Sequence, residues 1–179
     1  MNRRLPSDLI AWLTINNGIK VRGGFGNIIP VLHTPLPCEE MLGRREMMRG
    51  IYADLERPGE HQPAGTRSFE WLDGFLPIGD SFTDTHLFVD LRDGDLHGCV
   101  GHFDSEGGVE LPQWFSVAEM LADVADALTL DQPALQDHGR RSHAAAPYWT
   151  PRAWHPYLDD DYLRWNLVEL DPQPPAEAD

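Results

Sequence analysis

The sequence has few cysteines and no long run of hydrophobic residues. Cys38 and Cys99 are its only cysteines, which excludes a disulfide framework or a four-cysteine zinc site and fits a reducing compartment. No run approaches the roughly 18 apolar residues of a membrane span, and no apolar signal segment follows the N-terminal arginines. The sequence therefore predicts a cytoplasmic globular protein that does not enter membranes.

Basic residues are also scarce. The chain has 14 Lys and Arg against 29 Asp and Glu, which gives a formal net charge of -15, and Lys20 is its single lysine. Nucleic acid is therefore not expected as a partner, because phosphate backbones require a basic surface. An acidic protein is suited to a basic protein partner, since complementary charge raises the encounter rate. Solubility alone is the other explanation of this charge.

Two helices are predicted in the first third of the chain. The first begins at residues 6–8, where Ser7 or Asp8 can provide the N-cap, and it ends before Gly18. The second begins near Pro37 and runs to about residue 55. Its apolar residues predict its buried face: Met41, Leu42, Met48, Ile51, Tyr52 and Leu55.

The clearest helical pattern covers residues 116–128. Ser116 and Glu119 have the spacing of a capping box, which satisfies backbone donors at a helix start. Apolar residues at the helical period predict the buried side: Val117, Met120, Leu121, Val124 and Leu128. The opposite side carries Glu119, Asp123 and Asp126, and we expect it to face solvent.

Residues 75–104 have three short apolar runs separated by turn-forming residues and edged with carboxylates. Apolar residues alternate through 87–91, as in a strand with one buried face, and we assign Asp90 to a structural hydrogen bond. Arg92 to Asp95 predicts a tight hairpin turn, with Leu96 to Phe103 as the returning strand. This pattern predicts a sheet whose ends display acidic residues.

Other segments are shorter or polar. Short strands are expected at Val21 and at 28–31, around a turn at 23–26. Polar loops are predicted at 57–68 and 131–147, and the aromatic segment 148–165 predicts one or two further strands. Residues 171–179 lack apolar side chains and are expected to be disordered. The prediction is one domain over residues 1–170 with a disordered tail at 171–179.

Two patterns could carry chemistry. Gly79-Asp80-Ser81 resembles the nucleophile block of the Gly-Asp-Ser-Leu lipases and esterases, but the sequence has neither their Gly-x-Asn-Asp nor their Asp-x-x-His pattern. Turn chemistry is therefore the preferred role of Ser81. Histidine and cysteine residues with a nearby carboxylate could bind a metal: His86, His97, Cys99, His102 and Asp104. Strand alternation places residues 97 and 99 on the face opposite 102, so we prefer a buried or half-exposed cysteine flanked by surface histidines.

Several short motifs follow one another along the chain: Leu5-Pro6-x-Asp8-Leu9, Trp12-Leu13, Asn17-Gly18, Phe75-x-Pro77-Ile78, Leu87-Phe88-x-Asp90-Leu91-Arg92, Gly98-x-Val100, Phe103-Asp104 and the helix Ser116 to Leu121. Their order and spacing resemble the SUKH superfamily. The resemblance implies an α+β domain with a central, mainly antiparallel sheet wrapped by helices. It also implies a non-catalytic role, since the bacterial members are typically immunity proteins and the yeast founders regulate cell-wall assembly.

These observations predict an immunity protein that binds and neutralises a polymorphic toxin with a basic surface, such as a nuclease. An adaptor linked to cell-wall assembly and a small Gly-Asp-Ser hydrolase are the alternatives. No catalytic residue, cofactor or metal is predicted. On charge alone, an acidic rim of the sheet is the predicted partner-binding surface: Asp80, Asp84, Asp93, Asp95, Asp104 and Glu106.

Overall fold

The structure is a computed structural model that describes residues 3–19, 28–30, 32–81, 84–109, 111–146 and 148–171. In chain order its elements are α1 (Ser7–Ile15), β1 (Thr34–Pro35), α2 (Cys38–Ile51), the 3-10 helix η1 (Pro58–His61), β2 (Phe75–Asp80), β3 (Thr85–Asp90), β4 (Val100–Asp104), α3 (Val117–Leu130), α4 (Gln136–Ala145), β5 (Arg152–Asp159) and β6 (Tyr162–Glu169). The predicted strand at Val21, the turn at 23–26 and all but the first residue of the 171–179 tail lie outside the described residues. The predicted α+β class is confirmed.

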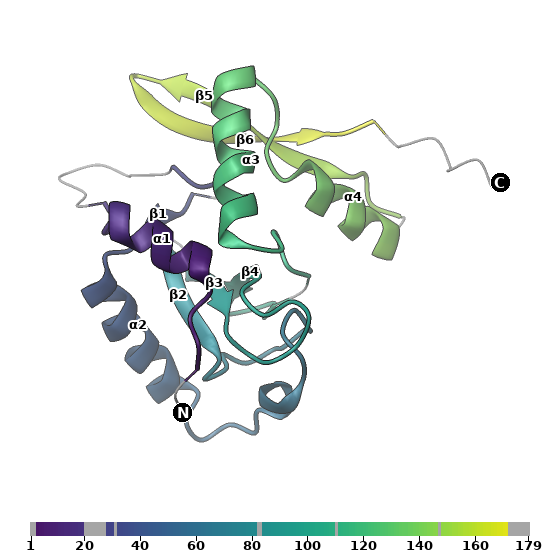
Figure 1. Cartoon of the computed structure of the whole chain (residues 1–179). Helices are drawn as coiled ribbons and strands as arrows, with labels where there is room; N and C mark the ends of the chain where they lie inside the picture. The colour runs from purple at the N-terminus through teal and green to yellow at the C-terminus, as the bar shows by residue number, and fades with distance from the viewer. Residues whose placement is uncertain are drawn as a thin grey trace.

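The centre of the molecule is an antiparallel four-stranded sheet in the order β1-β2-β3-β4. Figure 1 shows α1 and α2 beside this sheet and α3 rising from it toward the β5–β6 hairpin, which crosses the far end of α3. The hairpin is a separate two-stranded sheet, which confirms the prediction of strands in the aromatic segment. The predicted arrangement of helices around a central antiparallel sheet is therefore confirmed.

Each face of the central sheet has its own hydrophobic cluster because strand side chains alternate. The first cluster joins the sheet to α1 and α3, and its members include Leu9, Trp12, Ile78, Leu87, Val89, Val117 and Met120. The second is largely aromatic and includes Trp71, Phe75, Phe88 and Phe103. Gly101 faces Phe88 on the neighbouring strand, and a Cβ there would lie 2.5 Å from the Phe88 ring. The glycine is thus required by close packing.

The connection between β3 and β4 is longer than predicted. β4 begins at Val100 and not at Leu96, because Arg92 turns inward and is 1% exposed. Its guanidinium binds Asp90 (Nη2 to Oδ2, 2.7 Å) and the Gly59 carbonyl oxygen (Nη1 to O, 2.7 Å). Asp90 also accepts the Gly65 N–H at 2.9 Å, so its predicted structural role is confirmed and extends to a buried ion pair.

The two N-terminal helices occur where predicted, with different details. The N-cap of α1 is Pro6 and no side chain caps it, so the cap prediction is wrong. Asp8 instead accepts the Ala118 N–H at 2.9 Å and ties α1 to the start of α3. In α2, Met41 and Met48 are buried as predicted, but three residues predicted to be buried are mostly exposed: Leu42, Ile51 and Leu55. Leu42 and Ile51 lie on α2, whereas Leu55 lies beyond the end of the helix at Ile51, so the helix is shorter than predicted.

The α3 helix has the predicted capping box. The Ser116 Oγ accepts the Glu119 N–H at 3.0 Å, and the Glu119 carboxylate accepts the Phe115 N–H at 2.8 Å. Leu121 and Leu128 are 37% and 46% exposed, against the prediction. Asp123 is not simply solvated, because its Oδ2 accepts both the Trp114 Nε1–H and the Leu135 N–H at 2.8 Å.

The helix α4 occupies a segment that was predicted to be a loop. Its sequence is polar, so no amphipathic pattern signals it, and its position depends on packing against β5. Gly139 allows this contact, because a Cβ at that position would lie 1.8 Å from the Arg152 carbonyl oxygen. Among the helices of the described residues, none has the length and apolar character needed to cross a membrane.

Candidate functional site

The six predicted rim carboxylates occupy two separate ends of the central sheet. Strand register places Asp80 opposite His86 and Thr85 opposite Asp104, so four of the six gather where β2 ends, β3 begins and β4 ends. These four are Asp80, Asp84, Asp104 and Glu106. Asp93 and Asp95 follow the other end of β3. The rim is therefore not one continuous surface, and we call the group of four the acidic end.

Asp80 is already engaged by neighbouring side chains. It forms an ion pair with Arg44, its Oδ1 lies 3.0 Å from His86 Nδ1, and Oδ1 also accepts the Ser81 N–H at 3.1 Å. Burial opposes ionisation of Asp80, but the His86 hydrogen bond and the Arg44 charge outweigh it and lower the pKa of the carboxyl. Asp80 therefore supports the fold more directly than it serves a partner.

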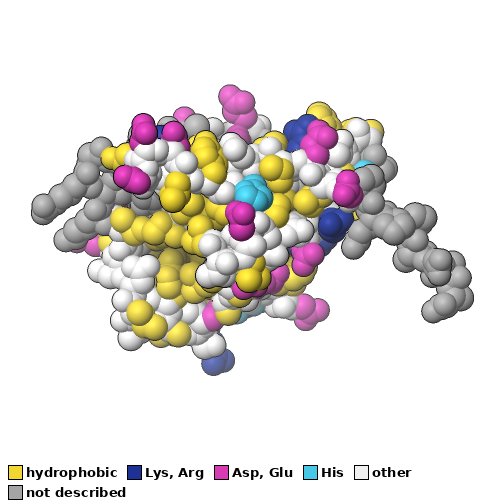
Figure 2. Space-filling view, turned by 90° about the horizontal axis from the view of Figure 1, so that it is seen from above, with side chains coloured by type: hydrophobic (Ala, Val, Ile, Leu, Met, Phe, Trp, Pro, Cys, Tyr) yellow, Lys and Arg dark blue, Asp and Glu magenta, His cyan; other side chains and the backbone are white. Residues whose placement is uncertain are grey.

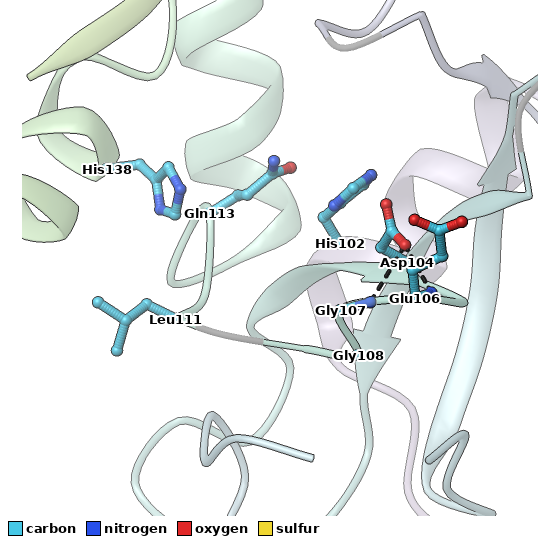
Figure 3. Close-up of a pocket in the computed structure, with 8 residues that line it drawn as sticks. All are labelled: His102, Asp104, Glu106, Gly107, Gly108, Leu111, Gln113 and His138. Carbon is cyan, nitrogen blue, oxygen red and sulfur yellow. Dashed lines mark hydrogen bonds between the residues drawn. The ribbon is translucent and has the colours of Figure 1, made fainter. Parts of the chain in front are cut away.

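A cavity of about 470 Å³ opens beside two members of the acidic end, Asp104 and Glu106. Figure 3 shows its lining residues, which come from β4, the turn after it, the segment before α3, and α4. They are His102, Asp104, Glu106, Gly107, Gly108, Leu111, Gln113 and His138. Its volume lies in the range of ligand pockets, about 300–1,000 Å³.

Asp104 is held in place by the turn that follows β4. Its Oδ1 accepts the N–H groups of Glu106 (2.7 Å) and Gly107 (3.2 Å), an arrangement typical of an Asx turn. Gly108 closes the turn with backbone hydrogen bonds to Asp104 in both directions, and its φ of +71° favours glycine. The turn uses one carboxylate oxygen, and the Glu106 side chain beside it is exposed.

Gln113 is the most unusual polar residue of the cavity. It is 7% exposed, and its side-chain Oε1 is buried without a hydrogen-bond partner in the described part of the chain. Two hydrogen bonds fix its backbone. The Gln113 N–H donates to the Val100 carbonyl (2.9 Å), and Arg141 Nη2 donates to the Gln113 carbonyl (3.1 Å). Figure 3 shows its side chain between His138 and His102. An unpaired buried acceptor costs about 1–3 kcal/mol.

His102 has a second polar atom of this kind, since its Nε2 is buried without a partner among the described residues. Its pKa is lowered from the ordinary value, chiefly by burial, although the Asp104 charge acts in the opposite direction. A neutral imidazole has one donor and one acceptor nitrogen, so Nε2 can be an acceptor when the proton is on Nδ1. His33 packs edge-on against this ring, with centroids 5.3 Å apart.

His138 closes the α4 side of the cavity. Its Nδ1 donates to the Pro112 carbonyl at 3.2 Å, and its Nε2 lies 3.4 Å from the Ser142 hydroxyl, which donates to it in the neutral ring. Both ring nitrogens therefore have partners. The cavity is lined by two carboxylates and by the unpaired acceptor Gln113 Oε1, an arrangement suited to a cationic donor group.

The other sequence candidates lie elsewhere or have structural contacts. The Ser81 hydroxyl donates to the Thr85 carbonyl at 3.1 Å and lies 2.7 Å from the Thr85 hydroxyl, contacts that belong to the turn between β2 and β3. Cys99 is buried, and burial raises the pKa of its thiol to about 12. His86 is 6% exposed, so the expectation of a surface histidine is wrong there. In the described ranges, no group of three or more His, Cys, Asp or Glu residues could hold a metal ion.

Sequence reasoning found Asp104 and Glu106 but missed Gln113 and His138. His138 was missed because it lies on α4, a helix that was predicted as a loop. Gln113 had no local signal, because its importance comes from burial beneath α3 and α4. His138 is brought beside β4 only by the packing of α4, and Gln113 by its backbone hydrogen bond to Val100.

The comparisons with known proteins give one match. The family model described as SMI1 / KNR4 family (SUKH-1) matches residues 1–123. No curated protein and no solved structure matches the chain. The matched range contains β4 and the turn with Asp104 and Glu106, and it ends within α3, so His138 lies beyond it.

Proposed function

The chain belongs to the SMI1/KNR4 family (SUKH-1), and from this premise we propose that it is a non-catalytic immunity protein. In this proposal it neutralises a toxin domain by binding a basic surface of that domain at the acidic end of the sheet. The observation that carries the proposal is the open cavity beside Asp104 and Glu106, in a protein with a net charge of -15.

The charge distribution supports a basic partner. On the face seen from above in Figure 2, Asp and Glu side chains surround an area of hydrophobic side chains, while Lys and Arg side chains are few. Carboxylates on strand ends and turns can meet a basic surface without complete desolvation, which keeps the cost of burying their charge low. Such a complex should form quickly and weaken as salt screens exposed charges beyond about 8 Å.

The test compares charge removal at the two ends of the sheet. The first variant combines Asp84→Asn, Asp104→Asn and Glu106→Gln; Asn at 104 retains the oxygen that accepts the turn N–H groups. The matched control combines Asp93→Asn and Asp95→Asn, which lie beyond the opposite end of β3. If a toxin gene lies beside the gene of this protein, protection of cells that express that toxin and capture of the toxin at low and high salt are measured for both variants.

We expect the acidic-end variant to lose protection and capture, and the control to keep them. Equal effects of the two variants, or capture that does not weaken with salt, would contradict binding at this end. A partner that the cell makes for itself, with no toxin encoded nearby, would instead indicate an adaptor. Esterase activity that disappears in Ser81→Ala would indicate a hydrolase.

A further inference from the structure

The cavity has two carboxylates and two unpaired polar atoms among its lining residues, and these groups define the chemistry of its occupant. Gln113 Oε1 and His102 Nε2 are buried and have no partner in the described ranges, and two carboxylates stand at the rim. The His138 ring does not change this balance, because its nitrogens are occupied by Pro112 and Ser142. A suitable ligand brings several N–H donors and a positive charge.

From this geometry we propose that the cavity is a socket for the guanidinium group of an arginine side chain on the partner protein. The inference rests on the proposed function, and it names the residue type on the partner and the position it occupies. Asp104 and Glu106 contribute negative charge, and the Gln113 side chain contributes a hydrogen-bond acceptor next to His102 (Figure 3).

Guanidinium fits this arrangement better than ammonium does. It is planar, weakly hydrated and has five N–H donors in a fixed fork, so it can reach acceptors on different walls together. The ammonium of lysine is a compact and strongly hydrated point charge. Gln113 Oε1 has no hydrogen-bond partner in the described part of the free protein, so a ligand whose N–H donor reaches it satisfies an unpaired group.

A partner-free titration tests the socket directly. The probe is Nα-acetyl-arginine amide, followed by NMR amide shifts of the ¹⁵N-labelled full chain. The control ligands are Nα-acetyl-citrulline amide, which replaces guanidinium by a neutral group of the same length, and Nα-acetyl-lysine amide. We expect a dissociation constant on the order of 1 mM for the arginine probe, shifts centred on residues 102–113 and 138, and weaker binding of both controls.

Two variants identify the groups that hold the probe. Gln113→Met keeps the length of the side chain but removes its acceptor, and we expect a loss of affinity of about ten-fold. Glu106→Gln changes an exposed side chain that does not support the core, and we expect a loss of about two- to five-fold. Asp93→Asn, at the other end of β3, should leave the affinity unchanged.

Equal binding of arginine and citrulline probes would overturn the proposal, as would shifts that map outside the cavity. Tight binding of the lysine probe would overturn the preference for guanidinium. If Gln113→Met does not fold, an unchanged affinity in Glu106→Gln would count against the socket by itself. Probe binding with no toxin partner would refute the proposed function and leave the socket intact.

Discussion

Burial of His33 makes the stability of this protein depend on pH. His33 is fully buried; its Nδ1 donates to the Pro30 carbonyl at 3.1 Å, and its Nε2 is buried without a partner in the described part of the chain. Burial and the neighbouring His102 lower the pKa of His33 from 6.5 to about 3, while the Pro30 hydrogen bond acts against them. The folded protein therefore holds this ring in its neutral form.

The sign of the effect follows from proton linkage. Below pH 6.5 the unfolded chain takes up a proton at His33 and the folded chain does not, so acid favours unfolding. The contribution of His33 to the free energy of unfolding is fully present above pH 6.5 and is lost progressively as the pH falls to about 3. At pH 5 the loss from His33 alone is about 2 kcal/mol, because each pH unit between the two pKa values contributes about 1.4 kcal/mol.

Urea unfolding at pH 7.5 and pH 5 measures this term. The perturbation is His33→Phe, which keeps a ring against His102 but cannot take up a proton. We expect the wild type to lose about 2 kcal/mol more than the variant between these pH values. His61→Phe is the control. Because His61 is exposed on η1, this substitution should leave the pH dependence of the unfolding free energy unchanged. An equal loss in wild type and His33→Phe would refute the reasoning.

Two further substitutions test the buried ion pair of Arg92 and the close contact between α4 and β5. Arg92→Met leaves the buried Asp90 carboxylate without its ion-pair partner, so the free energy of unfolding should fall by about 3–5 kcal/mol. A loss below about 1 kcal/mol in urea unfolding would contradict this role. Gly139→Ala forces α4 away from the Arg152 carbonyl and should cost about 1–3 kcal/mol, with faster hydrogen exchange in α4. Its control, Gly43→Ala, has open space around the new methyl group and should stabilise α2 by about 0.5–1 kcal/mol; equal effects of the two glycine changes would be inconsistent with the steric explanation.

Local sequence patterns were sufficient to predict an element where its hydrogen bonds and caps involve residues close together in the chain. The Ser116 and Glu119 capping box, the start of α2 at Pro37 and the alternation along β3 all involve residues that are neighbours in sequence. Such patterns predict the type and order of elements because their period and caps are properties of one segment. The same signals misplaced the start of β4, because the Arg92 contact with Gly59 joins segments 33 residues apart.

The candidate site shows the same division between local and distant information. The carboxylates of Asp104 and Glu106 could be assigned to a turn at a strand end from the sequence. The cavity beside them could not, because its other walls come from Gln113 and from His138 on α4. The sequence of α4 is polar with few apolar residues, so its contact with β5 and its hydrogen bonds to the Pro112 and Gln113 carbonyls decide where this helix lies.

The sequence by itself determined an acidic α+β protein, the positions of its first three helices and the core strands of its sheet, because composition and periodicity are encoded segment by segment. Only the tertiary structure decided that the predicted rim divides between two ends of the sheet and that Gln113 and two histidines line a cavity beside one of them. Strand register and helix packing bring together residues that are distant in the chain, and no local pattern records which of them will meet.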